Sequence, residues 1–275
     1  MEDNLESLLL VNDVCGYGRV STFAMLPVLA HYGLHPYVLP TALVSNTLDY
    51  GTSEILDTSD FMKRTIRKWD ELGFKFNCIS TGFINSGEQA SIIIDLIEAQ
   101  DSPLVFVDPI MADDGKLYPD MYKGAIDSNR KLASKATVIM PNFTEALMIS
   151  GLFEGRASLT KEEYKLVIDK ICELGPKDIV IKSCIDNDGI SFNLVYDART
   201  DSINKLEYEY IPTPFIGTGD IFSSVLIAEY LCGKSLIEAV RISSNFVCDV
   251  IKANNTNEDR FDIRHEKCLH LLNIK

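Results

Sequence analysis

The stretch that decides the fold reads Gly217-Thr218-Gly219-Asp220 and continues into an apolar run over residues 221–228. Two glycines and a small hydroxyl residue allow a tight turn, and a helix that begins there presents unpaired N–H groups and a positive dipole end to a phosphate. An acidic residue would repel a phosphate that is only bound. A carboxylate at this position is explained if it acts as a general base, taking a proton from a hydroxyl that attacks the phosphate. The simpler alternative is that Asp220 complements the dipole in the first turn of a helix.

The composition is that of a globular protein. The chain has 275 residues, 46% of them hydrophobic and 24% charged, and it shows no repeat and no low-complexity tract. We therefore expect one domain over residues 1–275. The 26 Lys and Arg residues face 40 Asp and Glu residues, for a net charge of −14. This charge repels nucleic acids and anionic membranes, so neither is expected as a partner.

The seven cysteines are scattered along the chain and never form a C-x-x-C pair. Together with the lack of a basic, apolar leader, this pattern predicts a reducing, cytoplasmic location. The four histidines form no zinc-ligand spacing with the cysteines. Apolar runs stay below 18 residues, so we expect no membrane-spanning segment.

Short apolar runs alternate with helical patterns along most of the chain, which is the rhythm of βαβ units around a buried parallel sheet. The predicted strands cover residues 8–11, 37–42, 76–80, 104–107, 137–140 and 179–182. The predicted helices cover residues 21–32, 59–72, 87–99, 120–134, 143–150 and 161–174. Capping-box spacing supports three helix starts, at Ser86/Gln89, Asn142/Glu145 and Thr160/Glu163.

The rhythm changes after Lys182. Residues 191–196 and 206–211 flank a polar turn over 197–201 and predict an antiparallel hairpin at a sheet edge. Two long helices, near 218–232 and 235–253, follow this hairpin. The tail opens with a polar loop, Asn254-Asn255-Thr256-Asn257, and ends in a short amphipathic helix. The expected fold class is therefore α/β, with a central, mostly parallel sheet flanked by helices.

The first predicted strand leads into Asn12-Asp13-Val14-Cys15-Gly16-Tyr17-Gly18. A strand followed by Gly-x-Gly suggests dinucleotide binding, but Ser21 stands where the third glycine belongs and no acidic residue follows at the expected distance. We favour a ligand loop at the carboxyl end of a parallel strand, where Asp13 meets a polar ligand group. A turn or capping aspartate is an equal alternative from the sequence alone.

Three further loops follow predicted strands. Asp108 and Asp113 come after strand 104–107, and such carboxylates are costly together unless they are solvated or neutralised by a cation. Glu145 comes after strand 137–140; it is spaced for a capping box with Asn142, but its carboxylate is also a candidate contact for magnesium, directly or through water. Lys182 and Ser183 end strand 179–182, where the lysine could neutralise a phosphate.

All four loops follow strands, so a parallel sheet places them at one edge. Their acidic residues need a divalent cation with its phosphates for charge balance. This combination is typical of a phosphotransferase site.

The order of these motifs resembles the ribokinase-like superfamily, and within it the vitamin B6 kinases, over residues 8 to 253. The Gly-Thr-Gly-Asp turn at 217–220 and Pro-Asn-x-x-Glu at 141–145 are superfamily elements, whereas Asp-Pro-x-Met-x-Asp at 108–113 with Gly115-x-Leu117-Tyr118 is specific to the B6 branch. The resemblance implies a three-layer fold without a large lid, ATP and Mg²⁺ as cofactors with a possible monovalent cation, and a homodimer.

The resemblance also implies roles for individual residues. Asp220 is the catalytic base, and Gly217, Thr218 and Gly219 form an anion hole for the transferred phosphoryl group. Substrate contacts fall on Asp13, Ser45 and Phe83. Nucleotide contacts fall on Asp113, Tyr118, Asn142, Lys182 and Ser183. Glu145 and Asp108 are placed at the magnesium.

The chain departs from the B6 kinases in the second loop, where Ser45-Asn46-Thr47-Leu48-Asp49-Tyr50 lacks the usual His-Thr pair. Ala112 also stands at a position where glycine is frequent, and Asn85-Ser86 at one where Gly-Ser is frequent. The expected activity is ATP-dependent phosphorylation of the hydroxymethyl group of a B6 vitamer. The alternatives are a hydroxymethylpyrimidine kinase of thiamine synthesis, a catalytically silent relative that binds a vitamer or nucleotide, and, more distantly, a nicotinamide-binding enzyme.

Overall fold

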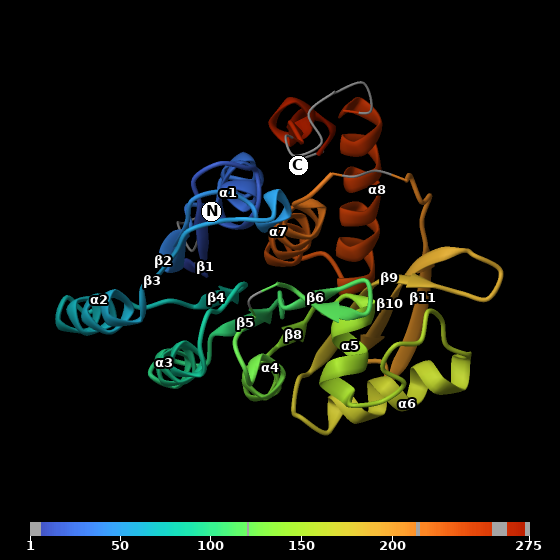
Figure 1. Cartoon of the computed structure of the whole chain (residues 1–275), viewed down its shortest axis with the longest axis horizontal. Coiled ribbons are helices and arrows are strands. Elements are labelled where there is room, and N and C mark those ends of the chain that lie inside the picture. Colours follow the sequence, from blue (N-terminus) through green and yellow to red (C-terminus); the bar gives the residue numbers. More distant parts are fainter. Residues whose placement is uncertain (1–6, 120, 213–214, 255–262, 273–275) are drawn as a thin grey trace. The chain divides into compact units, whose positions relative to one another are not determined.

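The computed structural model describes residues 7–119, 121–212, 215–254 and 263–272 (Figure 1). The chain divides into two compact units. Unit 1 comprises Met1–Cys78 and Glu209–Lys275, and unit 2 comprises Ile79–Tyr208. Each unit is an α/β assembly with its own core.

Unit 1 contains the first three strands. They are β1 (Leu8–Cys15), β2 (Tyr37–Val44) and the short β3 (Ile55–Asp57). β1 runs parallel to β2, and β3 runs antiparallel to β2. Residues 8–11 of β1 have no exposed surface, as a continuous apolar run predicts for a strand covered on both faces.

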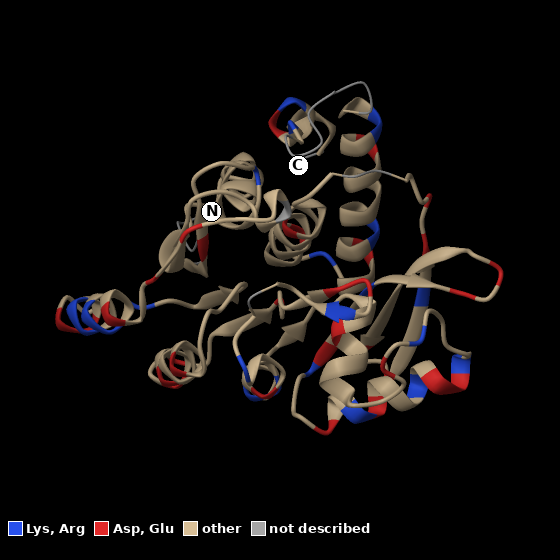
Figure 2. Cartoon of the chain, viewed as in Figure 1, with Lys and Arg blue, Asp and Glu red and all other residues tan. Residues whose placement is uncertain are grey.

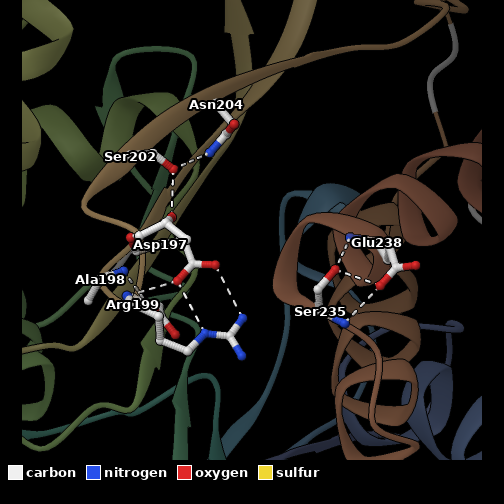
Figure 3. Close-up of polar contacts among 9 residues, drawn as sticks. Asp197, Ala198, Arg199, Ser202, Asn204, Ser235 and Glu238 are labelled. Atoms are coloured by element: carbon white, nitrogen blue, oxygen red, sulfur yellow. Dashed lines mark hydrogen bonds and ion pairs between the residues drawn. The ribbon is translucent and has the colours of Figure 1, made fainter.

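The helices of unit 1 pack around these strands. They are α1 (Ser21–His31), α2 (Ser59–Glu71), α7 (Thr218–Leu231) and α8 (Leu236–Asn254), with the 3₁₀ turns η1 (Leu48–Tyr50) and η2 (His265–Leu271). α1 packs on β1 and on α7, and α7 packs on α8. A capping box starts α8: the Ser235 N–H donates to Glu238 Oε2 at 3.1 Å, and Ser235 Oγ accepts the Glu238 N–H at 3.3 Å (Figure 3).

Unit 2 contains most of the remaining strands. In spatial order they are β11 (Ser202–Glu207), β10 (Ser191–Asp197), β9 (Asp178–Ile185), β8 (Val138–Ile139), β5 (Leu104–Val107) and β4 (Cys78–Thr81). β5, β8 and β9 are parallel neighbours, whereas β10 and β11 pair antiparallel. A small separate hairpin, β6 (Ala112–Asp113) and β7 (Lys116–Leu117), follows β5.

The helices of unit 2 are α3 (Gly87–Glu98), α4 (Ala125–Ala133), α5 (Phe143–Ser150) and α6 (Lys161–Cys172). Ser86 caps α3, and complete capping boxes start α5 and α6, as the spacing predicts. Acidic and basic residues are intermixed on α6, and separately on α2 in unit 1 (Figure 2). Such mixed helical surfaces favour solvent contact rather than a polyanionic partner.

The turn of the β10–β11 hairpin is held by one aspartate. Asp197 accepts from the Arg199 backbone N–H at 2.9 Å and pairs with the Arg199 guanidinium (Figure 3). β11 alternates half-buried and exposed residues, which is typical of a strand with one solvated face. The predicted turn is present, but the second strand begins at Ser202 rather than at residue 206, because Ser202 pairs directly with Asp197.

The predicted α/β class with a mostly parallel sheet, flanking helices and an edge hairpin is confirmed. Each predicted strand and helix is present, most of them within two residues of the expected bounds, but α4 begins at Ala125 rather than at residue 120 and β11 covers Ser202–Glu207 rather than 206–211. The short helix predicted for the tail is present as the 3₁₀ helix η2. Residues 255–257 of the predicted polar loop and residue 120 of the predicted fourth helix lie outside the described residues. That the two units form a single domain stays a prediction.

Candidate active site

The Gly-Thr-Gly-Asp turn begins α7 as predicted. Gly217 is the N-cap residue with φ +79°, and a Cβ added there would lie 2.4 Å from the Arg19 carbonyl oxygen. Only glycine fits this backbone conformation and this close approach. Thr218, Gly219 and Asp220 form the first turn of α7, where N–H groups have no intrahelical acceptor and attract an anion.

Asp220 is held by the start of another helix. Its Oδ2 accepts the Ser21 backbone N–H at 2.8 Å, across 199 residues of sequence. Ser21 is the first residue of α1 and has φ +52°, which is uncommon for a residue other than glycine. Strained residues of this kind cluster at functional sites. Sequence reasoning names Ser21 only as the residue that replaces a third glycine, and its place at the start of a predicted helix is the one signal that points to this contact.

Asp13 lies near the carboxyl end of β1, only 6% exposed. The Ser21 side chain lies close enough to the Asp13 carboxyl to lower its pKa, and the Ser21 N–H bonds Asp220. Burial raises the pKa of Asp13 to about 6, although hydrogen bonds from Ser21 and the Asp13 backbone oppose the shift. Burial, together with the negative charges of Asp13 and Asp220, raises the pKa of the Cys15 thiol to about 11. Asp13 and Asp220 therefore both lie close enough to Cys15 for their charges to act on its thiol.

The second loop packs against the Gly-Tyr-Gly loop. The Gly16 N–H donates to the Val44 carbonyl at 2.7 Å, and the Thr47 N–H donates to the Tyr17 carbonyl at 3.1 Å. A Cβ at Gly18 would lie 2.1 Å from the Thr47 methyl group. Thr47, which departs from the B6 kinase pattern, is therefore a packing residue of this loop.

Ser45 is used within the second loop. Its hydroxyl donates to Asn46 Oδ1 at 2.7 Å and accepts the Glu54 N–H at 2.9 Å. These bonds fix the shape of the loop that carries Ser45. Its role as a substrate contact stays a prediction.

A second cluster lies in unit 2, where Asp108 follows β5 and Lys182 lies in β9. Lys182 Nζ lies 2.8 Å from Asp108 Oδ2 and 2.9 Å from Asp108 Oδ1, and both residues are buried. The lysine thus neutralises a carboxylate of the same unit. A buried pair with this geometry is costly to break, because one charge would be left without compensation.

Glu145 is the N3 residue of α5 and is 2% exposed. Its Oε2 accepts the Asn142 N–H at 2.8 Å, and its Oε1 accepts the N–H groups of Met111 at 3.0 Å and Ala112 at 3.4 Å. Burial and the charge of Asp108 raise the pKa of Glu145, and Lys182 lowers it. Glu145 therefore ties the loop after β5 to the start of α5.

The remaining candidates of unit 2 lie around the same loops. Asn142 Nδ2 donates to the Ala112 carbonyl at 2.7 Å, and Asp113 Oδ1 accepts the Asp114 N–H at 2.9 Å on the exposed β6–β7 hairpin. The Tyr118 N–H donates to the Met111 carbonyl. Ser183 has φ +58° and donates its N–H to Asn193 Oδ1 at 3.1 Å. Phe83 is buried, with 9% of its surface exposed.

The described residues contain no group of three or more His, Cys, Asp or Glu side chains arranged to hold a metal ion. Magnesium commonly binds through one or two carboxylates together with substrate phosphates and water. Three backbone N–H groups already bond the Glu145 carboxylate, which has about four lone-pair sites. The donor set therefore fits magnesium best through water and phosphate.

Solved structures agree with this architecture. A Bacteroides thetaiotaomicron protein assigned to the phosphomethylpyrimidine kinases, crystallised in an orthorhombic form with pyridoxal, matches with a TM-score of 0.91 at 32% identity and covers 97% of this chain and 95% of that one. The pyridoxal kinase of Lactobacillus plantarum matches in fold with a TM-score of 0.88 at 23% identity, covering 98% and 96%. These folds, with the Gly-Thr-Gly-Asp turn, define a ribokinase-like kinase.

The sequence profile of the phosphomethylpyrimidine kinase family matches residues 24–264. A pyridoxine/pyridoxal/pyridoxamine kinase of Bordetella avium is 30% identical over 246 residues, 86% of this chain and 81% of that protein. A hydroxymethylpyrimidine/phosphomethylpyrimidine kinase of Aquifex aeolicus is 24% identical over 235 residues, covering 86% and 90%. This chain belongs to the phosphomethylpyrimidine kinase family.

Family membership establishes the class of reaction. The chain is a phosphotransferase of the pyridoxal kinase type with an alcohol group as acceptor, and the predicted resemblance to the vitamin B6 kinases is confirmed. Within the described ranges, no helix has both the length and the apolar character that a membrane span requires.

Proposed function

We propose that this enzyme transfers the γ-phosphoryl group of ATP to the hydroxymethyl group of a B6 vitamer (pyridoxal, pyridoxine or pyridoxamine) and forms its 5'-phosphate. The relative with 30% identity is a pyridoxine/pyridoxal/pyridoxamine kinase, and the Bacteroides structure contains pyridoxal. The observation that carries the proposal is Asp220, fixed by the Ser21 N–H in the first turn of the helix that follows Gly-Thr-Gly.

Asp220 acts as the general base. It takes the proton of the substrate alcohol as the alcohol oxygen forms a bond to the γ-phosphorus, and the bond from that phosphorus to the bridging oxygen of ADP breaks. The N–H groups of Gly217, Thr218 and Gly219 stabilise the charge on the transferred phosphoryl group. The bond from Ser21 holds the carboxylate in a fixed orientation, so little reorganisation is needed during the reaction.

Nucleotide contacts are assigned to unit 2, on the residues Asp113, Tyr118, Asn142, Lys182 and Ser183. Glu145 and Asp108 are the carboxylates that would hold Mg²⁺, both through water, because their oxygens already bond groups of unit 2. When bound, Mg²⁺ neutralises charge on the phosphates during transfer. A monovalent cation is a further candidate cofactor.

We extend the proposal to a cytoplasmic homodimer. All seven cysteines are free, which is the state expected in a reducing compartment. The dimer rests on the family resemblance, and sedimentation of the purified protein tests it directly.

A panel assay tests the substrate. Purified enzyme with ATP and Mg²⁺ is offered pyridoxal, pyridoxine, pyridoxamine and hydroxymethylpyrimidine, and ADP release is measured. We expect the highest kcat/KM with a B6 vitamer. Binding without ADP release from any of the four would contradict the proposal and favour a silent relative.

Hydroxymethylpyrimidine kinase activity is the second candidate, since the family profile and the Aquifex relative carry that name. A higher kcat/KM with the pyrimidine than with every vitamer would establish it in place of the first.

A further inference from the structure

The start of α1 lacks the local support that most helix starts have. Its N-cap residue, Val20, makes no side-chain bond to the first turn, and α1 has no acidic residue in that turn. Ser21 has φ +52°, a conformation that persists only where the surrounding structure holds it. The support must therefore come from other parts of unit 1. One of them is the Asp220 carboxylate, which accepts the Ser21 N–H.

Another part is the 3₁₀ helix η2 near the C-terminus, which packs on α1 and on α8. Directly before η2, the Arg264 N–H donates to Oδ1 of Asn254, the last residue of α8, at 3.0 Å. Arg264 and Glu266 are exposed, whereas His265 between them has no exposed surface. His265 is therefore the side chain that the start of η2 buries inside unit 1.

A histidine at this place does not serve stability best. Its Nδ1 lies 3.4 Å from the Ile263 carbonyl oxygen, and none of the residues that the structure describes gives its Nε2 a hydrogen-bond partner. An unpaired buried nitrogen costs free energy. Burial lowers the pKa of His265, and the backbone of Ala24 lies close enough to act on it in the opposite direction. The neutral ring thus lies against α1 one turn after Ser21.

Arg19 connects η2 with the Gly-Thr-Gly-Asp turn. Its Nε donates to Glu266 Oε1 at 2.9 Å. Its carbonyl oxygen lies 2.4 Å from the place that a Cβ on Gly217 would take. Two residues further along the chain, the Ser21 N–H bonds Asp220. This short segment therefore contacts η2, the first residue of the anion hole and the general base.

We infer that η2 positions the general base and that His265 is the positioning residue, because its buried ring holds the start of α1 in the conformation in which Ser21 orients Asp220. This inference rests on the proposed function and adds a residue to it. Without the ring, the first turn of α1 relaxes and the carboxylate loses its fixed orientation. A displacement of about 1 Å in a reacting group can lower a rate by about 100-fold.

The first test removes the ring. We expect His265→Ala to lower kcat by roughly 10-fold and to change the KM for ATP by less than about 2-fold. His265→Phe keeps the ring volume and leaves no nitrogen unpaired, so its kcat should stay within about 3-fold of wild type. His270→Ala is the matched control, since His270 is exposed on the same 3₁₀ helix. Met62→Ala, at a buried position of α2 in the same unit, controls for a general loss of stability.

A double-mutant cycle with Asp220→Asn separates positioning from a general structural role. If His265 acts through Asp220, His265→Ala should slow single-turnover transfer by less than about 2-fold in the Asp220→Asn background. Equal fold losses in both backgrounds would overturn the inference, and so would a wild-type kcat in folded His265→Ala. Thermal melting checks folding, and His265→Val, which leaves a smaller cavity, is the second variant should His265→Ala not fold.

Hydrogen exchange of the Ser21 N–H, measured by NMR, gives a readout that needs no turnover. We expect faster exchange in His265→Ala than in wild type, His265→Phe and His270→Ala. Unchanged exchange in folded His265→Ala would overturn the inference. If no substrate is phosphorylated, the proposed function fails, while the exchange rate still decides whether η2 holds the start of α1.

Discussion

Two clusters of buried carboxylates, one in each unit, follow strands of this protein and differ in how their charge is compensated. In unit 2, Asp108 pairs with Lys182 at 2.8 Å, and Glu145 accepts three backbone N–H groups. In unit 1, Asp13 is similarly buried, but none of the described residues donates a hydrogen bond to its Oδ1. In the unit 2 cluster, the carboxylate oxygens are bonded within the protein and tie loops together. In the unit 1 cluster, one carboxylate oxygen remains able to accept a hydrogen bond from a ligand.

This difference separates carboxylates whose oxygens are bonded within the protein from one that has an oxygen left for another donor. Three N–H donors fix the orientation of the Glu145 carboxylate, although burial and the charge of Asp108 raise its pKa to about 8. A carboxylate in an acidic, desolvated place binds a proton or an N–H donor more readily. Four substitutions, in order of decreasing effect on stability, sharpen or break the comparison.

Lys182→Met should have the largest effect. It leaves the buried carboxylates of Asp108 and Glu145 without their cation, which typically costs about 3–5 kcal/mol of the free energy of unfolding. Urea unfolding at pH 7 without ligands measures this loss. Lys165→Met is the matched control, since Lys165 pairs with Asp169 at 2.7 Å on an exposed helix surface. Equal losses of free energy of unfolding in both variants would show that the buried pair contributes no more to stability than the exposed pair.

Asp13→Asn should change the pH dependence of stability. The folded-state pKa of Asp13 is about 6 against an ordinary value of 3.8, so the wild type loses stability as the pH rises through this window. Asparagine does not titrate. Its advantage over wild type should therefore grow between pH 4 and 7, up to the order of 3 kcal/mol. Parallel urea titrations of both proteins across this range measure the difference in free energy of unfolding. A difference that stays constant with pH would contradict the raised pKa of Asp13.

Gly217→Ala should cost roughly 1–3 kcal/mol. The positive φ and the approach of the Arg19 carbonyl both oppose a Cβ. Gly233→Ala is the control, because Gly233 has φ +87° with nothing within 4 Å of its added Cβ. The excess loss in Gly217→Ala, seen in thermal melts, reports the close approach alone. Identical melting temperatures for the two variants would mean that the turn can relax.

Glu266→Gln should have the smallest effect. The carboxylate of Glu266 pairs with Arg19 at 2.9 Å, but both side chains are well exposed. Such a pair contributes about 0–1 kcal/mol and is screened by salt. We expect a small drop in melting temperature at low salt that disappears near 1 M NaCl. A large, salt-independent drop would instead show that this pair holds the tail to the α1 loop.

The fold was predictable because its signals are local. The apolar run of β1 and the spacing of Asn142 with Glu145 each specify one element over a few residues. The predicted bounds of β11 differ from the observed ones, because the polar residues of this strand alternate without a strong apolar pattern. The start of α8 also has a local signal in the sequence, because Ser235 and Glu238 have the spacing of the capping box that the structure contains.

The sequence predicts which residues belong to the candidate site, but it does not predict which of them contact one another. The pairing of Lys182 with Asp108 spans 74 residues, and the bond from Ser21 to Asp220 spans 199. Neither spacing has a local signature. The register shift at Asp13 and the positive φ of Ser21 likewise depend on how strands and helices pack. These features separate the satisfied cluster from the reactive one.

The central claim is that Asp220 is the general base. The direct test is the single-turnover rate of phosphoryl transfer by Asp220→Asn, measured with the best substrate of the panel and with nucleotide binding followed by calorimetry. We expect nucleotide binding to persist and the rate to fall by at least ~10²–10⁴-fold. A variant that transfers phosphate at the wild-type rate would contradict the account.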